Sequence, residues 1–218
     1  MKRPYDTVKR VLDVALAATG LLLATPILAA VALAVLVTMG RPVLFRQARP
    51  GRHGRLFHLV KFRSMTVGGE ASAPANDAAR LTTFGRWLRT TSLDELPQLW
   101  NVLRGEMSLV GPRPLLPAYL SRYTPEQSRR HEVRPGITGL QQVYGRNTLS
   151  WDERFTLDVR YVQRRSLVLD LRILLRTVRT VLLREGITAA GAATAHEYLG
   201  PTELATAGSG TVPAEGLR

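Results

Sequence analysis

The chain has 218 residues, long enough for one domain with a hydrophobic core, and 45% of them are hydrophobic, which excludes a disordered basic tail protein. It contains 30 Lys and Arg against 17 Asp and Glu, so the formal net charge is +13. That surplus predicts an anionic partner: a nucleic acid, a membrane surface or a phosphorylated small molecule. The absence of cysteine excludes a disulfide framework, a thiolate zinc site and a cysteine nucleophile.

The first long feature is an apolar run from Val11 to Met39 that contains one charged residue, Asp13. Its length and composition predict a membrane segment. Thr25-Pro26 lies near its middle, and a proline there removes a helical hydrogen bond and kinks the helix. Each arm would reach about 22 Å at ~1.5 Å per residue, which is short of the ~30 Å hydrocarbon core of a bilayer.

Basic residues flank this run on both sides, and residues 1–70 hold eleven Lys and Arg against three Asp and Glu. Because the excess of positive charge lies in the same part of the chain as the longest apolar run, a membrane is favoured over a nucleic acid as the anionic partner. Because positive residues prefer the cytoplasmic side, a re-entrant helix-break-helix would keep both flanks there, whereas a spanning helix would send one across. From the residues alone, the re-entrant segment and a kinked single span stay open with equal support. A buried soluble helix is a third and weaker alternative.

Short elements follow the apolar run. Residues 42–45 and 56–60 are expected to be strands separated by the turn at 49–51, and residues 68–80 a surface loop. Helices are expected at 83–104, 125–133 and 150–164, with breaks at 111–114 and 134–136.

Residues 167–185 are predicted to form an amphipathic helix with an apolar face and an Arg-rich face. Such a helix suits a membrane interface, but a helix packed on the core with a solvated basic face explains it equally well. Residues 188–218 are rich in Ala, Gly and Thr and are expected to be loosely ordered, although the segment 196–199 could dock on the domain.

Asp94 and Glu95 are the only acidic residues between Arg80 and Arg104. A structural explanation is a capping box, with Ser92 as the N-cap and Glu95 at the third helical position, and base rates favour it. The alternative is a functional role for the same two residues at the start of the helix. A helix N-terminus can hold a phosphate, and a carboxylate there can act as a nucleophile or metal ligand.

Basic residues that could bind phosphate surround this pair in the sequence. Arg113 stands out because it lies between two prolines, which hold the backbone and orient the side chain at low entropic cost. The histidine spacing does not fit a zinc site, and P-loop, Rossmann and GxSxG motifs are absent. The residues alone therefore suggest a membrane-attached domain whose carboxylate pair could bind Mg²⁺ and act on a phosphorylated substrate. The basic residues in question are Lys61, Arg63, Arg86, Arg89, Arg104, Arg113, Arg134 and Arg146.

Several long motifs occur in one order along the chain: 61–65 (KFRSM), 83–103 around Asp94-Glu95, 107–114 (MSLVGPRP), 134–140 (RPGITGL) and 145–147 (GRN). In these motifs the chain resembles the bacterial sugar transferase family, the monotopic phosphoglycosyl transferases that act on polyprenyl phosphate. The resemblance runs from about residue 5 to residue 187. It is closest to the short members of the family, such as those that start N-linked glycan assembly.

The resemblance implies a two-step reaction. Asp94 would be the nucleophile that attacks the β-phosphate of a UDP-sugar, releases UMP and holds the phosphosugar covalently until polyprenyl (undecaprenyl) phosphate takes it. Asp94 and Glu95 would bind Mg²⁺. Lys61, Arg89, Arg113 and Arg146 match basic positions expected to hold phosphates or the acceptor, and we add the neighbouring Arg63 to this group. The list of expected site residues is Lys61, Arg63, Arg89, Asp94, Glu95, Arg113 and Arg146.

The resemblance also implies a re-entrant membrane segment broken at Thr25-Pro26. The predicted fold is α+β and mostly helical, with that segment at 1–40, a small cytoplasmic catalytic domain with short strands and amphipathic interfacial helices at 41–187, and a tail at 188–218. One departure from the family pattern is Tyr144, where the family often has asparagine; it could alter the sugar pocket or simply pack.

The expected role is the first membrane step of bacterial glycan assembly (glycoprotein, capsule, exopolysaccharide or O-antigen), at the cytoplasmic face of the inner membrane. Expected partners are a UDP-sugar, polyprenyl phosphate and anionic lipids, with further copies of the chain and downstream glycosyltransferases as additional candidates. The alternatives are a non-enzymatic basic membrane anchor and a nucleic-acid-binding protein. Only 6% of the residues are aromatic and no stacking motif occurs, which argues against nucleic acid. The sequence does not identify the sugar.

Overall fold

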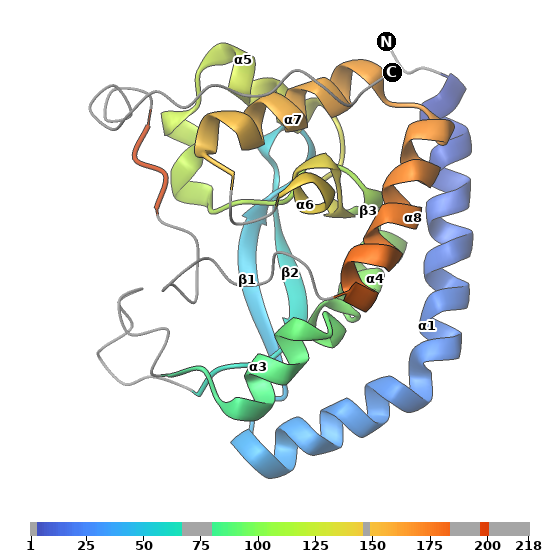
Figure 1. Cartoon of the computed structure of the whole chain (residues 1–218), viewed down its shortest axis with the longest axis vertical. Coiled ribbons are helices and arrows are strands. Elements are labelled where there is room, and N and C mark those ends of the chain that lie inside the picture. Colours follow the sequence, from blue (N-terminus) through green and yellow to red (C-terminus); the bar gives the residue numbers. More distant parts are fainter. Residues whose placement is uncertain (1–3, 67–79, 146–148, 184–196, 201–218) are drawn as a thin grey trace.

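A computed structural model of the chain describes residues 4–66, 80–145, 149–183 and 197–200. It is mostly helical with short strands, as the sequence predicts (Figure 1). The helices are α1 (Pro4–Met39), α3 (Thr83–Thr90), α4 (Gln98–Leu103), α5 (Pro125–Ser128), α6 (Leu140–Tyr144), α7 (Trp151–Arg164) and α8 (Leu167–Leu183). The strands are β1 (Leu44–Pro50), β2 (Leu56–Phe62), β3 (Ser108–Val110) and β4 (Gly136–Thr138). Four 3₁₀ segments complete the set: η1 (Arg52–Gly54), η3 (Leu93–Glu95), η4 (Pro117–Arg122) and η5 (Arg129–Glu132).

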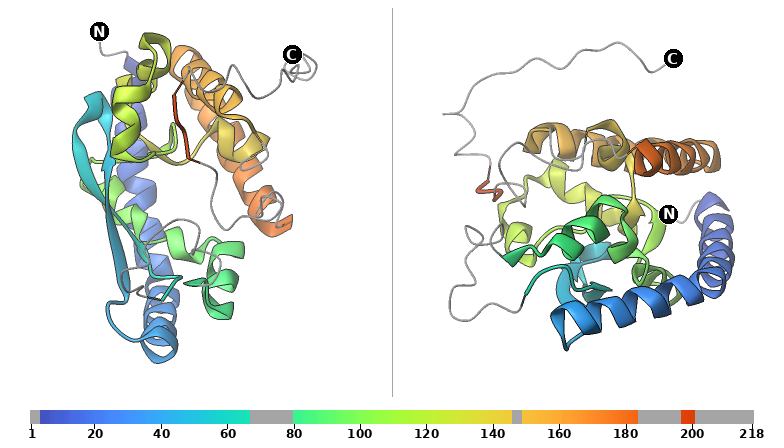
Figure 2. Two further views of the ribbon diagram at one scale, coloured as in Figure 1. Left: turned by 90° about the vertical axis from the view of Figure 1, so that its left-hand side faces the viewer. Right: turned by 60° about the horizontal axis from the view of Figure 1, so that its bottom comes forward.

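Helix α1 is continuous through Pro26 but bent into two arms (Figure 1). One arm runs beside α8, and the other passes beneath α3 (Figures 1 and 2). The predicted break is therefore a bend within one helix. The Thr25 hydroxyl donates a hydrogen bond of 2.9 Å to the Leu21 carbonyl, next to the turn that Pro26 weakens. Among the described residues, α1 is the one helix long and apolar enough to cross a membrane.

One face of α1 packs on the rest of the protein along both arms. Ala17 in the first arm is fully buried in a cluster with Val102 and Met107. Val31 and Val35 in the second arm are buried in a second cluster, which also holds residues of β2 and α3. The opposite face carries large exposed apolar side chains: Val11, Leu12, Leu16, Leu22, Leu23, Ile27, Leu33 and Val37. This division suits a helix that lies between a protein core and lipid.

Asp13, the single charge in the apolar run, faces the protein rather than the open side of α1. It is buried, and its carboxylate accepts hydrogen bonds from Ser108 Oγ at 2.7 Å and from the Leu109 backbone N–H at 3.2 Å. Lys9 lies one turn before it at 3.5 Å. The Asp13 carboxylate therefore connects α1 to β3. Its hydrogen bonds offset the unfavourable desolvation of a charge in an apolar segment.

The strands form two separate pairs. β1 and β2 make an antiparallel hairpin in which Leu44 pairs with Phe62 and Pro50 with Leu56, so the first strand begins and ends later than the predicted 42–45. β3 and β4 form a short parallel pair that the sequence analysis did not predict. A Cβ at Gly136 would lie 2.1 Å from the Gly111 nitrogen, so this pair requires a glycine at that position.

The predicted helix at 150–164 is confirmed by α7, and that at 125–133 is replaced by the shorter α5 followed by η5. Helix α8 packs on the core through Ile173, which is 1% exposed. The apolar face predicted for this segment is instead largely exposed at Val168, Leu171, Leu175 and Val178. The core contact is made by another side of the helix, and an exposed apolar stripe beside Arg side chains favours the membrane-interface interpretation.

The end of the described chain docks on an aromatic cluster. Tyr198 is fully buried against Tyr119, Trp151 and Phe155, and its hydroxyl donates to Gln127 Oε1 at 2.9 Å. The expectation that this short segment could dock is therefore confirmed for residues 197–199, whereas His196 lies outside the described residues. The division of the chain at residues 40 and 187 stays a prediction.

Candidate active site

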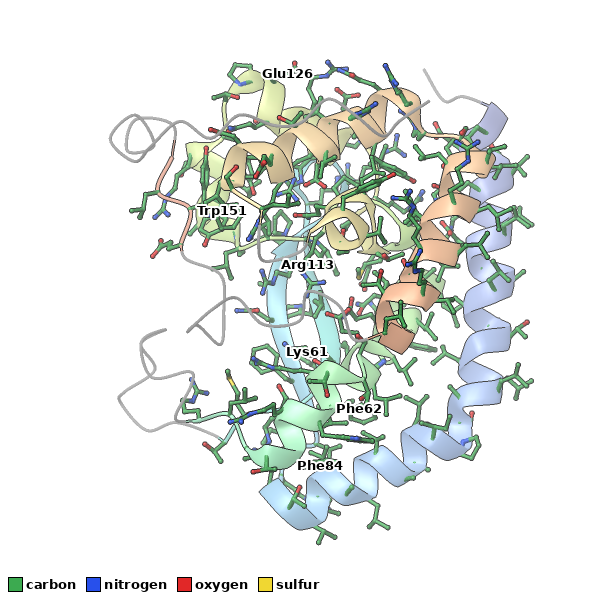
Figure 3. The ribbon with its side chains drawn as sticks, viewed as in Figure 1. Lys61, Phe62, Phe84, Arg113, Glu126 and Trp151 are labelled. Carbon is green, nitrogen blue, oxygen red and sulfur yellow. The ribbon has the colours of Figure 1, made fainter. Side chains whose placement is uncertain are left out.

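Three separate parts of the chain bring three of the expected basic residues to Asp94. Lys61 lies near the end of β2, Arg89 in the last turn of α3, and Arg113 in the segment after β3. All three cations interact electrostatically with Asp94, which lies in η3 between α3 and α4. Figure 3 shows Lys61 and Arg113 in front of the β1–β2 hairpin. The structure therefore gathers residues that are far apart in the sequence around one carboxylate.

The backbone around Asp94 and Glu95 does not form the capping box that the sequence analysis favoured as the structural explanation. Ser92 has a left-handed conformation with φ of 57°, and its side chain caps no helix. The predicted single helix over 83–104 is interrupted here, with α3 ending at Thr90 and α4 beginning at Gln98. The capping box is therefore wrong: the reversal at Ser92 starts a 3₁₀ turn and buries the Asp94 side chain.

Asp94 is only 5% exposed, yet no described residue donates a hydrogen bond to its carboxylate or pairs with it at ion-pair distance. Burial and, after it, the neighbouring negative charge of Glu95 raise its pKa, while Lys61, Arg89 and Arg113 oppose the increase, and together these effects place the pKa at about 6. A buried carboxylate surrounded by cations but without a bound donor keeps its oxygen atoms available for a reaction partner.

Glu95 is held in a different way. Nη2 of Arg113 donates a hydrogen bond of 2.8 Å to Glu95 Oε1, and the same contact is an ion pair. The Glu95 side chain is 22% exposed and that of Arg113 is 46% exposed, so this pair faces solvent more than Asp94 does. The Glu95 charge raises the pKa of Arg113 and keeps it cationic.

The backbone of Arg113 is supported by a buried ion pair that the sequence analysis did not identify. Nη2 of Arg130 donates to the Arg113 carbonyl at 2.6 Å and lies 2.7 Å from Asp158 Oδ2. Nη1 of Arg130 donates to the Tyr123 hydroxyl at 2.9 Å. Both charged side chains are 1% exposed. No local signal marks this pair, because Arg130 and Asp158 meet only through the packing of η5 against α7.

Lys61 and Arg89 are placed by their neighbours. The Lys61 ammonium lies 5.4 Å from the centre of the Phe45 ring, and burial together with Arg89 and Arg113 lowers its pKa, while Asp94 and Glu95 oppose that change. Arg89 Nε donates to Ser64 Oγ at 3.0 Å.

A glycine in α3 makes the contact between α3 and the end of the hairpin possible. A Cβ at Gly85 would lie 1.8 Å from the Ser64 carbonyl oxygen, so only glycine allows α3 to approach the segment that follows β2. This close approach is what brings Arg89, one turn further along α3, to Ser64.

The Arg63 side chain binds the end of α1. Its guanidinium is buried and donates to carbonyls at the end of α1: Nη1 to Arg41 at 3.1 Å, and Nη2 to Gly40 at 2.7 Å and to Met39. These contacts satisfy carbonyls that a helix C-terminus leaves unpaired. In the structure Arg63 therefore supports the end of α1, and its expected role in holding phosphate stays a prediction.

Two further expectations concern the end of α6 and the segment that follows it. Arg146 lies outside the described residues, so its predicted role stays a prediction. Tyr144 packs beside the cluster of Val110, Leu140 and Ile173, and the Arg176 guanidinium of α8 lies 4.4 Å from the centre of its ring. Tyr144 therefore connects α6 to α8, whatever effect it has on the sugar pocket.

The carboxylate pair can be tested for the predicted Mg²⁺ site. Among the described residues, no group of three or more His, Cys, Asp or Glu could form a metal cage. Mg²⁺ is commonly held by one or two carboxylates together with substrate phosphates rather than by protein alone. Asp94, which accepts no hydrogen bond from a described residue, and the adjacent Glu95 fit that second arrangement.

Comparison with known proteins adds three observations to this geometry. A family model described as bacterial sugar transferase matches residues 4–184. The chain is 50% identical over 202 residues to the uncharacterized sugar transferase EpsL of Bacillus subtilis, covering 91% of this chain and 98% of that protein. It is 44% identical over 188 residues to the UDP-glucose:undecaprenyl-phosphate glucose-1-phosphate transferase of Caulobacter vibrioides, covering 81% of this chain and 70% of that protein.

A third relative is larger. The undecaprenyl-phosphate galactose phosphotransferase of Salmonella typhimurium is 40% identical over 204 residues, covering 85% of this chain but only 42% of that protein. The names of the Caulobacter and Salmonella proteins both contain undecaprenyl phosphate and differ in the sugar, glucose in the first and galactose in the second.

Proposed function

This chain belongs to the bacterial sugar transferase family, and we propose that it transfers a sugar-1-phosphate from a UDP-sugar to undecaprenyl phosphate, with release of UMP, in polysaccharide biosynthesis. The observation that carries the proposal is the buried Asp94 carboxylate, which accepts no hydrogen bond from a described residue and lies in the field of Lys61, Arg89 and Arg113. A charged nucleophile surrounded by cations is what the attack on a diphosphate requires.

In the first step, an Asp94 oxygen attacks the β-phosphorus of the UDP-sugar. The bond from that phosphorus to the bridging oxygen breaks, and UMP leaves with the oxygen. In the second step, an oxygen of undecaprenyl phosphate attacks the same phosphorus, which releases the Asp94 carboxylate and forms the diphosphate-linked sugar. A covalent intermediate lets the soluble and the lipid substrate use one site in turn.

The cations have separate tasks in this scheme. Lys61 and Arg89 would balance the phosphate charge from the side of β2 and α3, whereas Arg113 would approach from the segment after β3 and orient Glu95 at 2.8 Å. Arg can hold a phosphate through two parallel hydrogen bonds. Mg²⁺, held by Asp94 and Glu95, would supply further neutralisation of the diphosphate charge.

We further propose that α1 enters and leaves the same leaflet, with the domain on the cytoplasmic face of the bacterial inner membrane. The bend at Pro26, the exposed apolar face and the basic residues on both flanks support this arrangement. The α8 stripe of Val168, Leu171 and Leu175 would then lie at the interface, where anionic lipids attract its Arg side chains. Self-association and contact with downstream glycosyltransferases stay predictions.

The nucleophile is tested with Asp94→Asn in detergent-solubilised protein, with a UDP-sugar and undecaprenyl phosphate as substrates and UMP release as the readout. The exposed Asp152→Asn in α7 is the matched control, because it makes the same change away from the site. We expect a loss of about a thousandfold or more in Asp94→Asn and none in the control. Undiminished UMP release in Asp94→Asn would overturn the assignment. A panel of UDP-sugars in the same assay identifies the sugar.

Topology is tested separately in this cysteine-free chain, which accepts single cysteines without interference. Cysteines placed at residues 2 and 70 should both react with an impermeant thiol reagent from the cytoplasmic side. Reaction from opposite sides would show that α1 spans the membrane.

A further inference from the structure

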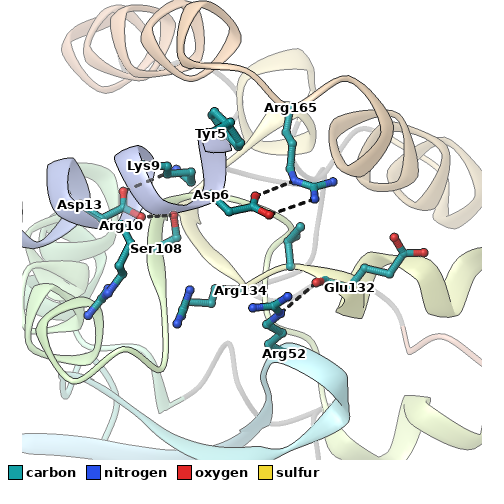
Figure 4. A pocket seen from close by; sticks show the side chains of 11 residues that line it. Tyr5, Asp6, Lys9, Arg10, Asp13, Arg52, Ser108, Glu132, Arg134 and Arg165 are labelled. Atoms are coloured by element: carbon teal, nitrogen blue, oxygen red, sulfur yellow. Dashed lines mark hydrogen bonds and ion pairs between the residues drawn. The ribbon is translucent and has the colours of Figure 1, made fainter. Parts of the chain in front are cut away.

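A charged cavity lies beside the start of α1, apart from the proposed catalytic residues (Figure 4). It is formed by α1, by the β1–β2 turn, by the segment before β4 and by Arg165 between α7 and α8. Its basic side chains are Lys9, Arg10, Arg52, Arg134 and Arg165, and its acidic side chains are Asp6, Asp13 and Glu132. Neither Asp94 nor the cations around it line this cavity.

Each acidic side chain of the cavity already has a partner. Asp6 pairs with Arg165 at 3.1 Å. Asp13 lies 3.5 Å from Lys9 and accepts the Ser108 hydroxyl, as described above. Glu132 pairs with Arg129 at 3.0 Å, and Arg129 does not line the cavity. The carboxylates of Asp6, Asp13 and Glu132 therefore pair with Arg165, Lys9 and Arg129, respectively.

The three remaining arginines, Arg10, Arg52 and Arg134, bind only backbone carbonyls within the described part of the chain. Arg10 donates to two carbonyls at the end of α4, at 2.8 and 3.1 Å. Nε of Arg134 donates to Gly105 at 2.8 Å, and Nε of Arg52 donates to Glu132 at 3.0 Å. Because Nε anchors the last two guanidinium groups, their orientation is set, while their terminal nitrogens have no hydrogen-bond partner among the described residues.

These three positive charges lie close together. Figure 4 shows Arg134 between Arg10 and Arg52 at the cavity. Partial burial lowers the pKa of Arg134, the charges of Arg10 and Arg52 lower it further, and the cavity carboxylates Asp13 and Asp6 oppose the change without reversing it. Like charges gathered in a half-buried cavity destabilise one another unless an anion joins them.

We propose that Arg10, Arg52 and Arg134 form a phosphate-binding site that is separate from the site at Asp94. Oriented guanidinium groups without carboxylate partners suit the several oxygens of one phosphate group. Arg10 directly precedes Val11 and Leu12, which are exposed apolar residues of α1. If α1 enters a bilayer as proposed above, the cavity lies at the depth of the lipid headgroups, so both a phospholipid headgroup and a free phosphate offer the required chemistry.

The site is tested with Arg52→Gln, because Arg52 is on the surface turn η1 and makes one backbone contact. Arg55→Gln is the matched control: it removes the same charge from an exposed residue that follows the same turn. The full chain in a phosphate-free detergent is titrated with inorganic phosphate at constant ionic strength, and the melting temperature is recorded. In parallel it is titrated with phosphatidylglycerol in mixed micelles.

We expect at least one probe to raise the melting temperature of the native chain and of Arg55→Gln by several degrees. In Arg52→Gln its apparent affinity should fall about tenfold, because a charge-assisted hydrogen bond is lost. A response to phosphatidylglycerol alone assigns the site to a lipid headgroup, and a response to inorganic phosphate assigns it to a soluble anion.

Three results would overturn the proposal. The first is an equal effect of Arg52→Gln and Arg55→Gln, and the second is no response to either probe; each would show that the three arginines only support backbone carbonyls. The third is a response that survives in Arg52→Gln and disappears in Arg113→Gln, which would place the anion at the proposed site around Asp94. Because none of these measurements uses UDP-sugar turnover, their outcome is independent of the proposed reaction.

Discussion

Two clusters of charged residues in this protein both contain buried aspartate, but in only one cluster does the aspartate accept hydrogen bonds from described residues. The anchor cluster, made of Tyr5, Lys9, Asp13, Ser108, Tyr161 and Asp170, joins α1 to β3, α7 and α8. There Asp170 accepts the Tyr5 hydroxyl at 2.6 Å and the Tyr161 hydroxyl at 2.8 Å, and lies 2.9 Å from Lys9. In the proposed catalytic cluster, made of Lys61, Arg89, Asp94, Glu95 and Arg113, Asp94 is similarly buried but accepts no hydrogen bond from a described residue.

The difference separates a structural from a chemical use of the same residue type. A buried carboxylate with several donors is stabilised in place and contributes to packing. A buried carboxylate that has nearby cations but no hydrogen-bond donor lowers the stability of the folded protein, because its lost hydration is not replaced. Such sites occur where a ligand completes the set of contacts. Four predictions test this division.

The largest effect is expected in the anchor cluster. Asp170→Asn removes the nearer of the two carboxylates beside Lys9 and leaves only Asp13 at 3.5 Å, so it should lower the free energy of unfolding by about 3 kcal/mol and the melting temperature by roughly 10 °C. Thermal unfolding in detergent measures this, with Asp152→Asn as the control. A melting temperature like that of the native chain would show that α1 is held by apolar packing alone.

A smaller effect is expected from Arg130, which we describe as a positioning residue because it acts through Arg113. Arg130→Lys keeps the charge beside Asp158 but cannot hold both the Arg113 carbonyl and the Tyr123 hydroxyl. We expect kcat to fall roughly tenfold to thirtyfold while KM for the UDP-sugar changes less. Steady-state UMP release separates the two parameters. A loss of stability with unchanged kcat would assign Arg130 to packing only.

The pH dependence tests the electrostatics of Asp94. Its pKa of about 6 lies above the usual range of an aspartate, so the proposed nucleophile is mostly ionised at pH 7 and becomes protonated as the pH falls. UMP release should therefore decrease about tenfold between pH 7 and pH 5. The melting temperature recorded at each pH shows whether the protein stays folded. A flat profile over this interval would contradict the raised pKa.

The smallest effect is expected at Tyr144, at the contact with α8. Tyr144→Asn removes the ring that faces Arg176 and should cost about 0.5–1 kcal/mol of stability. Thermal unfolding detects that change, and the UDP-sugar panel shows whether the sugar preference changes with it. A changed preference without a loss of stability would give Tyr144 a role in the sugar pocket.

Local sequence was enough to identify the proposed site residues and the main helices. The run after Val11, the bend at Pro26, the pair Asp94-Glu95 and the basic residues Lys61, Arg89 and Arg113 were all identified from composition, spacing and the family motifs, and the structure brings those charged residues together. These features depend on a residue and its near neighbours, so they can be recognised in a linear pattern.

Tertiary structure decided which charged side chains serve packing and which remain available for chemistry. Asp13 lies in an apolar run yet faces Ser108, Arg63 lies in a family motif yet binds the end of α1, and Arg130 reaches Arg113 and Asp158. Each of these partners comes from another element, so no local pattern records them. The sequence determined that a carboxylate pair lies among cations near a membrane helix. Only the fold decided that Asp94 is buried without a donor, because its burial depends on the left-handed turn at Ser92 and on the segments that pack around it.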